Sequence, residues 1–189
     1  MAHLTLYLTE DRGLSASSAA LVAGIVPLFQ FIGTALGGFL GDRVRKRLVA
    51  GIAMCVHGGA LLLLTWVDSW VAIAAFVVLH GLAWGTRGPL MNAIRADYFG
   101  ATAFGSIMGW STMVVMIGSI SGPIVAGALA DATGNYRLGF TLLAFGAIAG
   151  TGFWVAATPP DAPPSPIGEG VDHRGEPIGI AHDDVADTE

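Results

Sequence analysis

Long stretches without a charged residue are the feature that most constrains how this chain folds. Its 189 residues include 9 basic and 14 acidic side chains, which leave uncharged runs at 13–41, 48–67, 69–86, 98–130 and 138–160. The runs contain 29, 20, 18, 33 and 23 residues. A bilayer core about 30 Å thick takes about 20 apolar residues of helix. Four runs reach that length, and the third does so if Arg87 lies near a membrane face. The sequence therefore predicts an all-α, polytopic membrane protein.

Composition excludes several other classes of protein. Hydrophobic residues make up 53% of the chain and charged residues only 12%, so a soluble enzyme would have to bury five long apolar runs in a small core. The formal net charge of −5 argues against a nucleic-acid partner, which needs a basic face. A single cysteine, Cys55, provides neither a disulfide framework nor a thiolate metal site. An outer-membrane barrel would show segments of about ten residues with alternating polarity, and these runs are continuously apolar.

The runs predict five complete transmembrane helices and the end of a sixth. Residues 1–8 are apolar but would extend only about 12 Å as a helix, so we interpret them as the end of a helix. We expect a transmembrane bundle over residues 1–158 and, after Thr158-Pro159-Pro160, an acidic, disordered cytoplasmic tail over 159–189. The predicted spans are 18–40, 48–66, 70–91, 104–130 and 138–157.

The distribution of basic residues predicts the orientation in the membrane. Four bases fill the connection at 43–47, and basic loops stay on the cytoplasmic side. Alternation then places the Asp68 connection outside, the Arg95 connection inside, the connection at 131–137 outside and the tail inside. We expect a plasma (inner) membrane protein in contact with the lipid bilayer.

Glycines four residues apart predict close helix contacts, because small residues let helix backbones approach in a membrane. The pairs are Gly33/Gly37, Gly81/Gly85, Gly105/Gly109, Gly118/Gly122 and Gly146/Gly150.

The most specific motif joins the first two spans. It reads GGFLGDRVRKR over residues 37–47, and it combines small residues at a helix end, an acid at the boundary and a basic cluster. This stretch resembles the cytoplasmic loop signature of the major facilitator superfamily, G-x-L-x-D-R-x-G-R-R, although Arg45 stands where that pattern has a glycine. The resemblance implies a loop that latches one conformation, formed here by Gly38, Asp42, Arg43, Arg45, Lys46 and Arg47. The alternative is a stop-transfer basic cluster beside a helix-terminal acid.

Further stretches agree with that family. Gly118, Gly122 and Pro123 resemble its glycine-proline helix-packing motif, and 131–140 resembles the short hairpin before its final helix. Residues 79–89 and 96–100 resemble the corresponding helix and loop of monocarboxylate and oxalate/formate carriers. Together the matches imply the carboxy-terminal half of such a carrier, from the end of its seventh helix to its twelfth.

This resemblance implies a function. Carriers of the family hold a solute between two six-helix halves and work by alternating access. The expected function is transport of a small solute, such as an organic anion or carboxylate, with a second half-transporter chain as partner or as part of a longer chain. The alternative is a non-transporting remnant or a helical partner subunit. Coding sequence for about six further hydrophobic segments upstream of Met1 would favour the carrier.

Four residues are candidates for solute contact or gating. Arg87 lies within a predicted span, where a base is costly and usually functional; it could bind an anionic solute, snorkel to the interface, or pair with Asp97 or Asp42. His80, near the middle of the same span, could carry a coupling proton or be a hydrogen-bonded core histidine. Gln30 could reach the solute by hydrogen bonding, and Trp84 could line the cavity or pack in the core.

No pattern in the sequence supports catalysis. The histidines have no acid partner in helical register, and neither H-E-x-x-H nor a nucleophile elbow occurs. The glycines recur at helix-packing spacing rather than as a phosphate-binding loop. We therefore expect no enzyme activity, no cofactor and no metal site.

Overall fold

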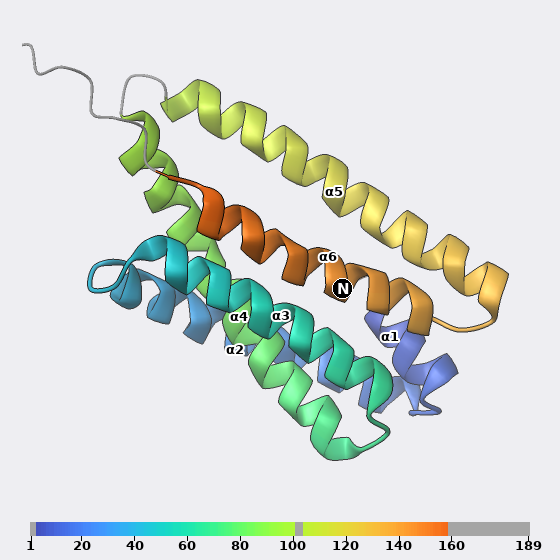
Figure 1. Ribbon diagram of the computed structural model, residues 1–189. Helices are drawn as coiled ribbons and strands as arrows, with labels where there is room; N and C mark the ends of the chain where they lie inside the picture. The colour runs from blue at the N-terminus through green and yellow to red at the C-terminus, as the bar shows by residue number, and fades with distance from the viewer. Residues whose placement is uncertain (1–2, 101–103, 159–189) are drawn as a thin grey trace, which may run out of the picture. The chain divides into compact units, whose positions relative to one another are not determined.

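The computed structural model describes residues 3–100 and 104–158, and within these residues every regular element is helical. A short amino-terminal stretch contains α1 (Leu4–Leu6) and a single π-helical turn, η1 (Tyr7–Asp11). Five long helices follow (Figure 1): α2 (Ala16–Gly41), α3 (Lys46–Trp66), α4 (Trp70–Phe99), α5 (Phe104–Thr133) and α6 (Arg137–Ala156). The predicted tail, 159–189, lies outside the described residues.

All five long helices are long and apolar enough to cross a membrane, with 20 to 30 residues each. The prediction of an all-α bundle of five spanning helices and the end of a sixth is confirmed. In α3 and α4, 56% and 50% of the most apolar window is buried, compared with 11% in α5. The centre of the bundle therefore lies at α3 and α4, and large apolar side chains of α2, α5 and α6 face outward, as lipid-facing helices require.

The tightest contact in the bundle joins α2 and α4. Added Cβ atoms on Gly33 and Gly37 would lie 2.4 and 2.5 Å from carbonyl oxygens of α4, and one on Gly85 would lie 2.0 Å from the Gln30 carbonyl oxygen. Only glycine permits this approach. The Thr86 hydroxyl crosses the same contact and donates to the Gly33 carbonyl at 3.1 Å. The prediction that these glycines mark close helix packing is confirmed.

A second small-residue contact joins α3 and α6. A Cβ on Gly58 would lie 2.7 Å from the Ala144 carbonyl oxygen. About two turns away, Thr151 Oγ1 donates to the Gly51 carbonyl at 3.2 Å and lies 3.2 Å from Cys55 Sγ. The lone cysteine is thus part of a helix contact.

The glycine pairs on α5 behave differently. A Cβ on Gly105, Gly109 or Gly118 would meet nothing within 4 Å, and one on Gly122 would make only an ordinary contact with Leu143 at 3.8 Å. The close helix contact expected from these positions is not formed.

Helix α4 continues well beyond the predicted span end at Met91. It runs to Phe99 and ends where Gly100 takes a left-handed φ of 66°, a conformation that costs glycine little. Residues 92–99, expected in a connection, are therefore helical. Arg87 consequently lies about three turns before the end of its helix, rather than at its edge.

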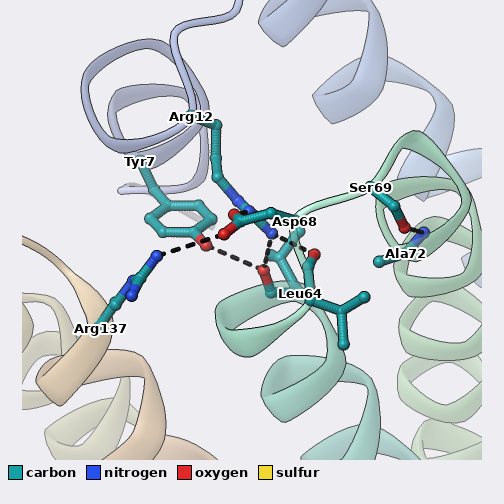
Figure 2. Close-up of polar contacts among 8 residues, drawn as sticks. Tyr7, Arg12, Leu64, Asp68, Ser69, Ala72 and Arg137 are labelled. Atoms are coloured by element: carbon teal, nitrogen blue, oxygen red, sulfur yellow. Dashed lines mark hydrogen bonds and ion pairs between the residues drawn. The ribbon is translucent and has the colours of Figure 1, made fainter.

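Charged and polar groups tie the amino-terminal stretch to the α3–α4 connection and to the start of α6 (Figure 2). Asp68 forms ion pairs with Arg12 of the stretch after η1 and, at 3.5 Å, with Arg137. The Tyr7 hydroxyl donates to the Leu64 carbonyl at 2.9 Å. The predicted topology puts these three charges on one side of the membrane, and the fold brings them into contact.

Candidate solute site

Two cavities lie between α4 and α5. The larger, of about 370 Å³, is lined by residues of all five long helices and of the amino-terminal stretch. The smaller, of about 250 Å³, is lined by α4 and α5 alone. Trp84 is part of the wall of both cavities.

The larger cavity has an apolar wall with imidazole groups. The rings of His57 on α3 and His80 on α4 lie 4.4 Å apart, and His80 also contacts Phe76 at 4.7 Å. The buried Nδ1 atoms of both histidines have no hydrogen-bond partner among the described residues. A buried polar nitrogen without a partner is costly, so these rings are available to a water or a solute in the cavity.

Gln30 reaches the same cavity from α2. The sequence places it midway along a span, and the structure brings it to the wall that also carries His80 and Trp84. Its side chain is half-buried, so its amide can hydrogen-bond a group in the cavity.

The smaller cavity is basic. Its wall includes Arg87, Asn92 and Arg95 of α4 and Thr112 of α5. The Arg87 guanidinium carbon lies 4.2 Å from the centre of the Trp84 ring, a cation–π contact. Arg95 donates to Asn92 Oδ1 at 3.3 Å. Two guanidinium groups and two neutral polar groups are suited to binding an anion.

Arg87 has no carboxylate partner among the described residues. The expectation that it could pair with Asp97 or Asp42 is wrong. Asp97 instead accepts from Lys46 Nζ at 2.6 Å. The reason is geometric, because ten residues of continuous helix turn by about 280°, which sends Asp97 to a different face of α4.

The cations of the predicted latch loop contact the ends of three helices. The Arg43 guanidinium lies 3.7 Å from the centre of the Phe39 ring at the end of α2, and Arg47 donates to the Ala157 carbonyl after α6. Lys46 reaches the end of α4 through Asp97.

Two further residues of this loop are Asp42 and Arg45, and Arg45 stands where the family pattern has a glycine. Asp42 is the exposed C-cap of α2 and forms no ion pair among the described residues, so the acid that engages the loop is Asp97. Arg45 has a φ of −57°, a value that any residue adopts, so the arginine fits this turn.

Three residues of the cavities were not found from the sequence as site residues. His57 was not among the candidate residues, and only the tertiary structure brings its ring against His80. Asn92 and Arg95 were placed in a connection. In the longer helix α4, Arg95 follows Arg87 by eight residues, a little more than two turns. A longer predicted helix would have placed both arginines on it.

Five long apolar helices, with cavities of about 370 and 250 Å³ among them, define a polytopic membrane protein. The sequence profile of the Major Facilitator Superfamily matches residues 1–181, and the chain belongs to this superfamily.

Curated relatives agree with this assignment. Monocarboxylate transporter 3 of Rattus norvegicus is 28% identical over 172 residues, which are 85% of this chain and 35% of the relative. The hexuronate transporter of Bacillus subtilis (strain 168) is 26% identical, covering 72% of this chain and 35% of the relative. For monocarboxylate transporter 13 of Bos taurus the identity is 26%, covering 91% and 42%. The chain thus spans well under half the length of these relatives. No solved structure gave a significant match.

Proposed function

We propose that this chain is one half of a secondary transporter that moves a small organic anion by alternating access. Its similarity to monocarboxylate and hexuronate transporters supports a carboxylate solute. The solute path would then have a second wall, supplied either by a partner half-transporter chain or by further sequence of the same polypeptide.

The observation that carries the proposal is the environment of Arg87. A guanidinium within a spanning helix is costly unless it is paired or serves a solute. Arg87 stacks on Trp84, faces a cavity with Arg95, and meets no carboxylate among the described residues. An anionic solute would supply the missing negative charge, because a carboxylate accepts two parallel hydrogen bonds from one guanidinium.

The conformational change would use the features around this site. Pro89 within α4 removes a backbone donor and lets the helix bend next to Arg87. The ion pair between Lys46 and Asp97 would act as the latch between the loop at 43–47 and the end of α4. We expect the loop and the tail at 159–189 to lie on the cytoplasmic side of the plasma (inner) membrane.

Proton coupling would depend on His80, together with His57. The two rings lie in contact at the larger cavity, and imidazole is the side chain that takes up and releases protons near neutral pH. If transport is proton-coupled, His80→Ala should abolish the pH dependence of uptake. An unchanged pH dependence in this variant would contradict the role of His80 in proton coupling.

The test is uptake by cells that express the chain together with the coding sequence that adjoins it, using labelled lactate and glucuronate as probes. Arg87→Gln should reduce carboxylate uptake at least tenfold at an equal protein level, and Arg87→Lys should retain part of it. Equal uptake by wild type and Arg87→Gln would overturn the assignment of Arg87. Uptake by neither, at normal membrane levels, would favour the alternative of a non-transporting remnant or partner subunit.

A further inference from the structure

The smaller cavity between α4 and α5 is lined by two arginines, Arg87 and Arg95. They lie eight positions apart on α4, a rise of about 12 Å along the helix, and both side chains are half-buried. Among the described residues that line this cavity, no other carries a charge. The cavity therefore has two positive charges on its wall.

The contacts of the two guanidinium groups leave both charges uncompensated. The Arg87 guanidinium lies against the Trp84 ring at 4.2 Å. Arg95 donates to Asn92 Oδ1 at 3.3 Å and to Met108 Sδ at 3.4 Å. These partners are all neutral, and neither arginine forms an ion pair among the described residues.

Two positive charges beside one cavity favour a solute with two negative charges. Like charges repel, and the repulsion grows where bulk water is excluded. A solute with a single negative charge neutralises one guanidinium and leaves the other without a partner, and a poorly hydrated charge without a partner is costly. A dianion neutralises both arginines and also removes their mutual repulsion.

Two neutral side chains add hydrogen-bond donors to the same cavity. A carboxylate has about four lone-pair sites, and one guanidinium fork occupies two of them. The Asn92 amide group, whose oxygen accepts from Arg95, still has its two N–H donors, and Thr112 on α5 has its hydroxyl. Both residues line the cavity, so they can satisfy carboxylate oxygens that the arginines leave free.

We propose that the solute is a short dicarboxylate, with one carboxylate bound to Arg87 and the other to Arg95. A four-carbon dicarboxylate is small enough for a cavity of about 250 Å³. This inference rests on the proposed function, because it takes the anion bound at Arg87 as the solute. It names a different class of solute from the monocarboxylates after which several similar proteins are named.

The test compares succinate with two monoanions of matched size, its monomethyl ester and butyrate. Binding is measured by isothermal titration calorimetry with the full chain in nanodiscs of zwitterionic lipid at about pH 7.5, where carboxylates are ionised. A hydrogen bond to a charged group strengthens binding about tenfold or more, so succinate should bind at least tenfold more tightly than either monoanion. Arg95→Gln should remove this preference and leave the affinities of the monoanions within about threefold of wild type. Arg95→Lys keeps the charge and should retain part of the preference.

A matched control and the Arg87 variant separate the possible outcomes. Arg137→Gln removes a guanidinium that lines neither cavity, and it should leave the preference for succinate unchanged. If binding depends on Arg87 but succinate and the monoanions bind equally, the dicarboxylate is overturned and the proposed function stands. The same holds if the preference survives Arg95→Gln. If none of the three compounds binds more weakly to Arg87→Gln than to wild type, both proposals are overturned.

Discussion

Arg12 and Asp68, 56 positions apart in the sequence, form an ion pair that fastens the amino-terminal stretch to the α3–α4 connection. The Arg12 guanidinium also donates to the Val67 carbonyl at 2.7 Å and to the Leu64 carbonyl. Its side chain is only 6% exposed, whereas that of Asp68 is 67% exposed. A nearly buried cation thus contacts carbonyl groups at the end of α3 and a carboxylate at the surface (Figure 2).

Removing the charge of Asp68 should destabilise the bundle. Asp68→Asn leaves the Arg12 charge with carbonyl partners only and also removes the pair with Arg137. Because the carboxylate is largely exposed, we expect a loss of only about 1 kcal/mol in the free energy of unfolding. Thermal unfolding in detergent would measure it. Asp131→Asn, at an exposed position on α5, is the matched control, and equal unfolding temperatures for the two variants would contradict the prediction.

The hydrogen bond of the Tyr7 hydroxyl should contribute to the stability of the bundle. Tyr7→Phe should cost about 1 kcal/mol in the free energy of unfolding, because the Leu64 carbonyl loses the phenol as a donor but keeps Arg12. Denaturant titrations of both proteins at pH 7 would measure this difference. Equal free energies of unfolding would contradict the role of the phenol.

Two glycines of α4, Gly85 at the contact with α2 and Gly88 away from it, allow a matched comparison. Gly85→Ala would place a methyl group 2.0 Å from the Gln30 carbonyl oxygen, so the helices must separate, at a cost of about 1–3 kcal/mol. At Gly88 an added Cβ meets nothing within 4 Å, and alanine should stabilise α4 by up to about 1 kcal/mol. Thermal unfolding in detergent should move in opposite directions for the two variants. A similar effect of both would show that this helix contact is not as tight as the structure indicates.

The sequence predicts the five long helices well because the residues that indicate each helix lie within it or directly beside it. Uncharged runs and their flanking charges placed all five long helices, and glycine spacing found the contact of Gly33 and Gly37 with α4. The end of α4 was missed because Asn92, Arg95 and Asp97 are polar, although polar residues continue a helix readily once it leaves the apolar part of the membrane.

The candidate site could be predicted only in part. A charge within a predicted span marks Arg87, because the sequence alone shows a base at that position and a base there is usually functional. The contact between His57 and His80, and the place of Trp84 between two cavities, depend on how α3, α4 and α5 pack. No pattern within any one helix predicts these contacts between helices. The open space at Gly118 is a similar case, because the glycine spacing alone does not distinguish a close contact from a cavity wall.

Lys46 and Asp97 should be coupled weakly. Their atoms lie 2.6 Å apart, but the side chains are 27% and 51% exposed, and water and salt screen such pairs. A double-mutant cycle with Lys46→Gln and Asp97→Asn should give a coupling free energy of about 0.2–1 kcal/mol, and it should shrink as the salt concentration rises. A small coupling suits a latch, because a contact that must break in every transport cycle cannot be much stronger than thermal energy without slowing the cycle. A coupling above about 3 kcal/mol, the range of buried pairs, would identify the pair as a fixed structural tie between the loop and α4.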